Sequence, residues 1–197
     1  MFDFGSPNAY LCHKVLPGLA LRTGVRVDYV PILLGGLFKL TNNRSPAEAF
    51  SAVPSKRAYD ALEMRRFIAK HGLLAFRMND HFPVNTLALM RGAVAAKELD
   101  CFEHYVDAVY AGMWERNLNM AQPEVFERVL TEADLDAASI LAHAQDASVK
   151  ARLIDNTQKA YERGAFGSPT FFVGDEIYFG KERLQQVEEQ MVLQRSP

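Results

Sequence analysis

The 197-residue sequence contains only two cysteines, Cys12 and Cys101, and they lie far apart. This spacing excludes a CxxC redox pair and a cysteine-rich zinc site. The sequence also lacks an excess of either charge, since 22 basic residues face 24 acidic ones. A chain so balanced has no electrostatic basis for binding nucleic acid or an anionic membrane. No apolar run approaches the ~18 residues that a membrane span requires.

The composition that remains is typical of a folded domain. With 49% hydrophobic and 23% charged residues, the sequence predicts one domain, or one domain with an insertion, and not a disordered chain. Residues 1–7 lack the basic and apolar regions of a signal peptide, so the default expectation is a cytoplasmic, thiol-reducing setting. Met1 leads directly into the first expected strand. Two interpretations stay open: the natural sequence starts this close to the strand, or a few residues upstream of Met1 are missing from the sequence.

The first 32 residues read as strand, helix and strand. Phe2 and Phe4 flank a polar residue in a short first strand, and residues 8–21 carry apolar positions at helical spacing. Thr23-Gly24 is typical of a helix end. Residues 25–32 alternate with period two, which predicts a second strand. Two strands joined by a helix at this spacing are expected to run parallel.

The middle of the sequence is expected to be helical and the end to return to strands. Helices are predicted at residues 57–72, 86–116, 123–130, 134–145 and 149–163. A hairpin follows, with strands at 170–173 and 176–179 joined by a Gly-Asp turn, and then a closing helix at 182–193. The order βαβ, helical block, ββα predicts an α/β thioredoxin-like fold interrupted by a mostly helical insertion. We expect a thioredoxin-like domain at 1–45 and 164–197 and an insertion domain at 46–163.

Ser6 stands before Pro7 at the start of the first expected helix. Serine before proline is a frequent helix opening, and such a cap contributes roughly 1 kcal/mol. The same hydroxyl could donate to a thiolate that a ligand brings, because the positive end of a helix favours a negative charge. The spacing alone favours the capping role and leaves the second role open.

Two local sequences carry a resemblance to a known family. They are FDFGSPNAYL at residues 2–11 and GAFGSPTFFV at 164–173, the latter followed by FGKERL at 179–184. Further matches are LLGGLFK at 33–39, NNRSP at 42–46, FPVNT at 82–86 and MWERN at 113–117. Together they resemble the 2-hydroxychromene-2-carboxylate isomerase family, whose relatives are the kappa-class glutathione transferases within the wider DsbA-like group. The resemblance spans nearly the whole chain.

The resemblance implies that the sulfur of the active site comes from glutathione. In that family, the serine matched by Ser6 holds the glutathione sulfur, whereas the disulfide oxidoreductases of the wider group place an attacking cysteine there. Here the nearest cysteine, Cys12, lies six residues later within the predicted helix. The chain is therefore not expected to be a dithiol oxidoreductase.

The resemblance also implies a peptide-binding loop at Ser168-Pro169. From the local sequence alone, Pro169 would be interpreted as an ordinary proline at the start of a strand. A cis bond would then be unexpected, because only ~5–6% of X-Pro bonds in folded proteins are cis. The family keeps a cis proline opposite the start of the first helix. The backbone N–H and C=O of Ser168 are then expected to pair with glutathione, which is itself an extended peptide.

Three more residues are implied as glutathione contacts. The γ-glutamyl end is expected at the start of the last helix, where the family motif carries a small polar residue followed by aspartate. Lys181 and Glu182 depart from that motif, although Lys181 could pair with the carboxylate and Glu182 keeps the acidic charge. Asn43 matches a family asparagine near the thiol site. Plain helix capping by Glu182 and turn formation by Asn43 are the alternative roles.

The function that follows from the resemblance is a glutathione-dependent cis-trans isomerase of an aromatic-degradation intermediate. The expected reaction interconverts 2-hydroxychromene-2-carboxylate and trans-o-hydroxybenzylidenepyruvate. The implied partners are glutathione, a small aromatic substrate and a second copy of the chain, with no metal, nucleic acid or membrane. Two alternatives stay open: a kappa-like transferase that conjugates glutathione to electrophiles, and a non-catalytic thioredoxin-like domain that binds peptides or partner proteins.

Overall fold

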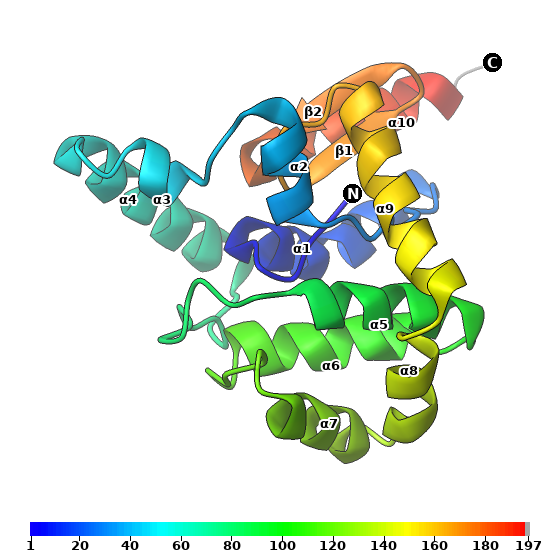
Figure 1. The fold of residues 1–197 in the computed structure, drawn as a ribbon. Coiled ribbons are helices and arrows are strands. Elements are labelled where there is room, and N and C mark those ends of the chain that lie inside the picture. The colour runs from blue at the N-terminus through cyan, green and yellow to red at the C-terminus, as the bar shows by residue number, and fades with distance from the viewer. Residues whose placement is uncertain (196–197) are drawn as a thin grey trace.

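The computed structural model of the chain describes residues 1–195 and brings both ends of the sequence into one layer (Figure 1). The described helices are α1 (Pro7–Thr23), α2 (Leu34–Thr41), α3 (Pro46–Ala49), α4 (Pro54–His71), α5 (Leu87–Glu98), α6 (Phe102–Trp114), α7 (Pro123–Glu132), α8 (Ala137–His143), α9 (Ala147–Glu162) and α10 (Leu184–Arg195). A 3-10 turn, η1 (Lys181–Arg183), precedes α10. The strands are β1 (Thr170–Val173) and β2 (Glu176–Phe179).

The predicted hairpin at the end of the chain is confirmed. β1 and β2 pair antiparallel, with Thr170 opposite Phe179 and Val173 opposite Glu176. Gly174 occupies the turn with a φ of 60°, a left-handed conformation that glycine adopts without a steric penalty. Met1 lies beside the start of this hairpin, where the Thr170 N–H donates to the Met1 carbonyl at 3.2 Å.

The parallel pairing near the N-terminus is confirmed in direction but is shorter than predicted. Phe2 and Pro31 form one parallel bridge, in which the Phe2 N–H donates to Val30 and the Ile32 N–H donates to Phe2, both at 3.1 Å. The prediction of a strand throughout 25–32 is wrong. Residues 25–29 have an alternating sequence, but no strand ladder within residues 1–195 includes them.

The single helix predicted for 86–116 is also wrong, because the chain folds back in its middle. α5 ends at Glu98, Asp100 takes a left-handed φ of 55°, and α6 begins at Phe102. The two helices pack closely, and the Tyr105 hydroxyl donates to the Leu89 carbonyl at 2.7 Å. A Cβ at Gly92 would lie 2.1 Å from that hydroxyl oxygen, so this contact requires glycine.

The remaining helices follow the sequence with small changes at their ends. α1 ends, as predicted, at Gly24 with a left-handed φ of 63°. α2 and α3 were not predicted as helices. α9 packs against both α2 and α5, whereas α3 and α4 project away from the body of the molecule (Figure 1). The division into domains at residues 46 and 163 stays a prediction, and its last two residues, 196–197, lie outside the described residues.

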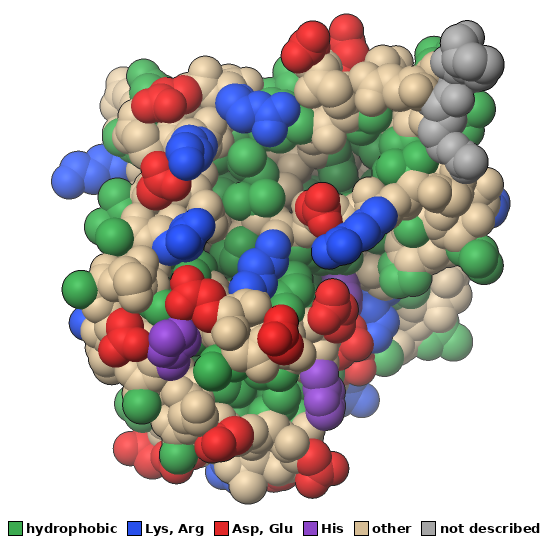
Figure 2. Space-filling view, turned by 90° about the vertical axis from the view of Figure 1, so that its right-hand side faces the viewer, with side chains coloured by type: hydrophobic (Ala, Val, Ile, Leu, Met, Phe, Trp, Pro, Cys, Tyr) green, Lys and Arg blue, Asp and Glu red, His purple; other side chains and the backbone are tan. Residues whose placement is uncertain are grey.

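The hydrophobic residues form one large core and two smaller ones. The large core joins Phe2 and Phe4 to α1, α5 and α6, and it extends to α7, α8 and α9. A second core lies between α1, α10 and the hairpin. Basic and acidic side chains are interspersed on the face drawn in Figure 2, with hydrophobic side chains visible between them. Within residues 1–195, no helix is both long and apolar enough for a membrane crossing.

Candidate functional site

Ser6 lies at the N-terminus of α1, where the chain turns sharply out of the first extended segment. Its backbone is extended (φ −97°, ψ 112°), and its Oγ accepts a hydrogen bond from the Ala9 N–H at 3.2 Å. This geometry confirms the N-cap role. The next free donor of the helix is the Asn8 N–H, for which residues 1–195 provide no acceptor. Ser6 and Asn8 therefore present two polar groups at the positive end of α1.

The Ser168-Pro169 loop meets Ser6 from the other end of the sequence. The peptide bond between the two residues is cis, as the resemblance implied. The Ser6 hydroxyl donates to the Ser168 carbonyl at 2.8 Å, and the Ser168 hydroxyl accepts from the Asp3 N–H at 3.1 Å. Both serines are buried, with 5% and 8% of their surface exposed. Two residues that are 162 positions apart thus form one hydrogen-bonded pair.

The two backbone groups of Ser168 differ in their pairing within the chain. The Ser168 carbonyl accepts from the Ser6 hydroxyl, because the tight turn before α1 brings the two groups together, and a carbonyl oxygen keeps a second lone pair for a ligand. The Ser168 N–H is different. Among residues 1–195, no acceptor is paired with it. The Ser168 N–H is therefore an unpaired backbone donor of this loop.

The buried carboxylate of Asp3 stabilises the turn that leads into Ser6. Asp3 is 1% exposed, and its side chain accepts from the Gly5 N–H at 2.8 Å and the Leu34 N–H at 2.7 Å. The Thr86 hydroxyl provides a further hydrogen bond. Burial raises the pKa of this carboxyl above its usual value, while the three donors oppose that rise. Asp3 thereby ties the Ser6 turn to the start of α2 and to the segment before α5.

Trp114 fixes the same turn from the helical block. Its side chain is fully buried, and its indole N–H donates to the Phe4 carbonyl at 2.8 Å. Trp114 is therefore a core residue. The hydrogen bond adds a function to that packing, since it holds the backbone two residues before Ser6.

Sequence reasoning did not identify Asp3 or the polar role of Trp114. For Asp3, a signal was present: an acidic residue stood between two phenylalanines in an expected buried strand. A buried carboxylate needs hydrogen-bond partners, and these are most often supplied where backbone groups converge. For Trp114, the sequence offers no indication of which carbonyl its N–H would reach.

Asn43 lies near this loop without touching Ser6. Its side-chain amide donates to the Phe166 carbonyl at 3.0 Å, two residues before Ser168. Asn43 follows Asn42, which ends α2 in a left-handed conformation with a φ of 51°. The observed contact is therefore a bridge between the loop after α2 and the loop before β1.

Lys181 and Glu182 come directly after Gly180 in the sequence. The Gly180 N–H donates to the Pro169 carbonyl at 3.0 Å, which places the two residues near the Ser168-Pro169 loop. The Lys181 side chain is 5% exposed, its ammonium pairs with Glu182, and it lies 5.9 Å from the centre of the Phe67 ring. An ammonium has three donors, so this pairing leaves further hydrogen bonds to be made. Lys181 is thus a buried cation close to the loop, and Glu182 is its more exposed counterion.

Cys12 does not contribute a reactive sulfur to this site. It lies within α1, is 1% exposed, and packs with Leu16, Leu19 and Met191. Burial raises the pKa of its thiol far above the ordinary value, and the nearby Glu182 carboxylate raises it further. A protonated, covered thiol is a poor nucleophile.

We therefore expect Cys12 to resist alkylation in the folded protein. With iodoacetamide at neutral pH, the half-buried Cys101 is expected to react before Cys12, and Cys12 only after denaturation. Mass spectrometry of peptides from the native and the unfolded protein measures both sites. A Cys101→Ser variant isolates the Cys12 signal, and modification of its native form at the rate of an exposed thiol would contradict the assignment.

A separate cavity of about 350 Å³ lies between residues 25–30 and β1. Its lining includes Pro169 but not Ser6, Asn43, Ser168, Lys181 or Glu182. We place the chemistry at Ser6 rather than in this cavity, because the unpaired donors and the helix terminus lie at Ser6. The structure therefore brings Ser6, Ser168 and Pro169 together. Asn43 bonds to Phe166 in the same loop, and the Lys181-Glu182 pair follows Gly180, which bonds to Pro169.

Comparison with known proteins places this geometry in context. The family described as DSBA-like thioredoxin domain matches residues 1–192. A curated protein of Sphingobium xenophagum named 2-hydroxychromene-2-carboxylate isomerase is 29% identical over 192 residues, covering 95% of this chain and 93% of the relative. Glutathione S-transferase kappa 1 of Caenorhabditis elegans is 23% identical, covering 94% of this chain and 86% of its own. A solved structure titled as 2-hydroxychromene-2-carboxylate isomerase superposes with a TM-score of 0.81 at 25% identity, covering 96% of this chain and 91% of that one.

Proposed function

The chain belongs to the DSBA-like thioredoxin domain family, and from that premise we propose that it is a glutathione-dependent isomerase of an aromatic-degradation intermediate. The membership confirms the thioredoxin-like fold predicted from the sequence. The proposed reaction interconverts 2-hydroxychromene-2-carboxylate and trans-o-hydroxybenzylidenepyruvate, which agrees with the name shared by three curated relatives. The observation that carries the proposal is the Ser6 hydroxyl at the start of α1, beside the unpaired N–H of Ser168.

The groups around Ser6 fit a peptide that carries a thiol. Ser6 has a single hydroxyl proton, which now points to the Ser168 carbonyl. When a thiolate is present, this proton can turn toward the sulfur, while Ser6 continues to accept from Ala9. The Asn8 N–H lies at the same end of α1 and has no other acceptor within residues 1–195. The unpaired Ser168 N–H matches a carbonyl of an extended peptide.

These donors also account for activation of the thiol. Lowering a thiol pKa by about two units requires roughly 2.7 kcal/mol of preferential stabilisation of the thiolate. A helix N-terminus contributes about 0.3–1 kcal/mol, and up to ~2 kcal/mol where it is partly buried. A charge-assisted hydrogen bond from Ser6 adds about 1.5–3 kcal/mol. When Ser6 turns to the sulfur it gives up its bond to the buried Ser168 carbonyl, and in this account a peptide N–H of glutathione replaces that bond. With that replacement, the two effects together reach the required magnitude without a cysteine from the chain.

Bound glutathione supplies the thiolate whose reversible addition to a conjugated double bond allows rotation about that bond. The chain's own residues hold the reacting groups in place. Ser6 holds the sulfur, Ser168 orients the peptide backbone, and Lys181 provides a cation for a carboxylate. Asp3 and Trp114 do not touch the ligand in this account, and they keep the Ser6 turn in position.

The proposal is tested by following isomerisation of 2-hydroxychromene-2-carboxylate spectroscopically with and without glutathione. We expect turnover only when glutathione is present, and we expect the glutathione concentration to stay constant. Turnover of equal rate without glutathione would overturn the proposal. A stable conjugate formed with consumption of glutathione would identify the chain as a kappa-like transferase, a reading favoured by its similarity to Glutathione S-transferase kappa 1.

Lys181 provides a separate prediction about glutathione binding. Lys181→Met removes a buried cation, and a hydrogen bond to a charged group contributes about 1.5–3 kcal/mol. We therefore expect the Kd for glutathione, measured by calorimetry, to rise about tenfold or more. Glu182→Gln removes the competing anion and is expected to leave the affinity unchanged or stronger. Lys70→Met, in the last turn of α4, is the control for the loss of a lysine elsewhere. Unchanged affinity in Lys181→Met would remove Lys181 from the site.

We also propose that the protein forms a homodimer and that it is located in the cytoplasm, as the family resemblance implies. Phe50, Val53 and Tyr59 are exposed apolar side chains on the projecting α3–α4 segment, which supports a surface covered by a partner. Sedimentation at micromolar concentration measures the assembly directly.

A further inference from the structure

Three successive backbone N–H groups near the start of the chain each donate to a side chain. The Asp3 N–H donates to the Ser168 hydroxyl at 3.1 Å, and the Gly5 N–H donates to the Asp3 carboxylate at 2.8 Å. Between them, the Phe4 N–H donates to the thioether sulfur of Met90 at 3.4 Å. A thioether is a weak acceptor, whereas a hydroxyl and a carboxylate are strong ones. The bond to Met90 is therefore the weakest of the three bonds that hold this turn.

Met90 reaches Phe4 from α5, which belongs to the helical block. Both side chains are 0% exposed. The Phe4 carbonyl accepts from the indole N–H of Trp114, at the end of α6, at 2.8 Å. Both polar groups of the Phe4 backbone are thus bound by side chains of the helical block, from two helices that pack against each other. Because Ser6 follows only two residues later, its position depends on this attachment.

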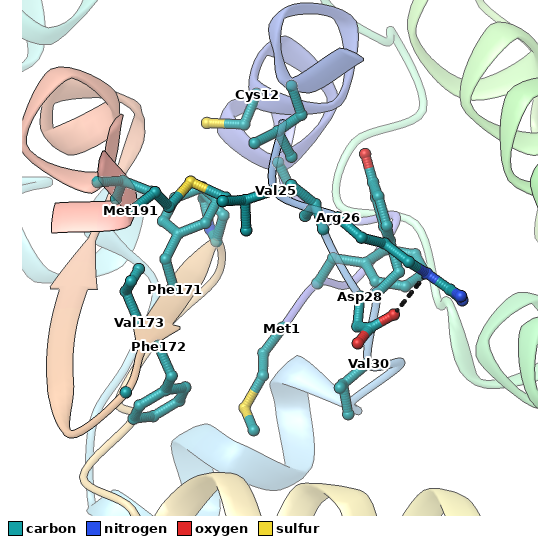
Figure 3. Close-up of a pocket in the computed structure, with 18 of the residues that line it drawn as sticks. Met1, Cys12, Val25, Arg26, Asp28, Val30, Phe171, Phe172, Val173 and Met191 are labelled. Carbon is teal, nitrogen blue, oxygen red and sulfur yellow. Dashed lines mark ion pairs between the residues drawn. The ribbon is translucent and has the colours of Figure 1, made fainter. Parts of the chain in front are cut away.

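The sulfur of Met90 is used differently from the other methionine sulfurs. In the described part of the chain, Met90 alone among the methionines accepts a backbone N–H through its sulfur, and Met113 is buried in the same core without such a bond. Met1 and Met191 instead line the cavity drawn in Figure 3. Leucine fills the space of a buried methionine nearly as well, so packing does not require a sulfur at this position. The buried Phe4 N–H requires an acceptor there.

We propose that Met90 is a positioning residue for the site: its sulfur, through the Phe4 N–H, fixes the Ser6 hydroxyl relative to the Ser168 loop and the ligand sulfur. The inference rests on the proposed function of Ser6. The Ser6 hydroxyl has one proton to place, and it now lies 2.8 Å from the Ser168 carbonyl. A displacement of about 1 Å, even from a change outside the site, can lower a rate about a hundredfold. Without the Met90 acceptor, the Phe4 N–H seeks another partner and the turn moves with it.

Met90→Leu keeps the apolar volume and removes the acceptor. We expect kcat for glutathione-dependent isomerisation to fall about tenfold with little change in KM, a smaller loss than a full 1 Å displacement causes. We also expect the thiol pKa of bound glutathione to rise, measured by thiolate absorbance in a Cys12→Ala, Cys101→Ala background. Amide hydrogen exchange at Phe4, followed by NMR without glutathione, is expected to become faster, because the N–H loses its partner.

Met113→Leu is the matched control. Met113 is also 0% exposed and lies in the same core, so the two leucine variants are expected to have similar Tm values. Met113→Leu is expected to keep the kcat, the bound thiol pKa and the Phe4 exchange rate of the unmodified chain. Equal values of these three quantities in Met90→Leu and Met113→Leu would overturn the inference alone. Absence of a bound thiolate in the unmodified chain would overturn the proposed function, and the inference with it.

Met90→Gln separates positioning from stability. Glutamine offers a carbonyl oxygen as an acceptor but buries an amide group, so this variant is expected to have a lower Tm than Met90→Leu. It is nevertheless expected to have a bound thiol pKa closer to that of the unmodified chain. A thiol pKa that follows the Tm across these variants would reduce Met90 to a packing residue and overturn the inference. The two leucine variants decide the question even where Met90→Gln does not fold.

Discussion

Ser6→Ala is expected to lower glutathione-dependent isomerisation by about a hundredfold to a thousandfold, the range seen when one preorganised donor is removed from a developing anion. In our account, the Ser6 hydroxyl is the side-chain donor for the glutathione sulfur at the start of α1. Alanine keeps the helix terminus but cannot donate. The thiol pKa of bound glutathione is therefore expected to rise, and kcat/KM at neutral pH is expected to fall.

The same substitution also lowers stability, because Ser6 has two structural bonds. It caps α1 by accepting from Ala9, and it provides the donor for the buried Ser168 carbonyl. Loss of a cap costs about 1 kcal/mol and an unpaired buried carbonyl about 1–3 kcal/mol. We therefore expect Ser6→Ala to show a measurable loss in the free energy of unfolding.

Two variants separate the catalytic effect from the structural one. Ser45→Ala removes a comparable cap at α3, where Ser45 accepts from Glu48 in an exposed capping box, and it is expected to leave turnover unchanged. Ser6→Thr keeps a hydroxyl and is expected to retain more activity than Ser6→Ala. Activity is compared at a temperature at which thermal unfolding shows every variant to be folded. Full turnover by folded Ser6→Ala would remove Ser6 from the mechanism.

Trp114→Ala is expected to lower the free energy of unfolding by about 3–5 kcal/mol, as for other fully buried large aromatic residues. The ring is 0% exposed and packs against Phe76 and Phe82, at centroid distances of 6.2 and 6.1 Å. The substitution leaves a cavity and also releases the Phe4 carbonyl. For a domain of this size, the Tm is expected to fall by about 10 °C.

Trp114→Phe divides the effect into packing and hydrogen bonding. Phenylalanine fills most of the space but cannot donate to Phe4, so its loss of stability is expected to be smaller than that of Trp114→Ala. Tyr161→Ala, at a side chain that is 41% exposed, is the control for removal of an aromatic residue at the surface. Chemical denaturation measures all three variants. A loss below about 1 kcal/mol for Trp114→Ala would contradict the role of Trp114 in joining the helical block to the Ser6 turn.

The parts of the fold that follow from local chemistry were predicted from the sequence. The Gly24 end of α1 and the Gly174 turn of the hairpin depend on backbone conformations that glycine favours, and both were correct. The break between α5 and α6 was missed, because apolar residues continue across Asp100 at helical spacing and the turn there uses an aspartate in a left-handed conformation. The turn brings Tyr105 against Gly92, a contact between two helices that the local sequence does not show.

Only the site residues that belong to a family motif were predicted from the sequence. Ser6 and the Ser168-Pro169 loop were identified through the family resemblance, and no local pattern relates two segments that are 162 residues apart. The partners of Asp3 and Trp114 depend on where three separate segments meet. The resemblance implied ligand contacts for Lys181 and for the Ser168 carbonyl, and the sequence did not indicate that these groups also pair with Glu182 and Ser6 within the chain.

The central claim is that the reactive sulfur arrives with glutathione and becomes a thiolate at Ser6. The most direct measurement is the pH titration of the ultraviolet thiolate absorbance of bound glutathione, in a Cys12→Ala, Cys101→Ala variant that has no sulfhydryl group of its own. We predict a bound thiol pKa about two units below the value near 8.5 of a free thiol, and loss of most of that shift in Ser6→Ala. An unshifted pKa in the cysteine-free protein, or an equal shift after Ser6→Ala, would contradict this account.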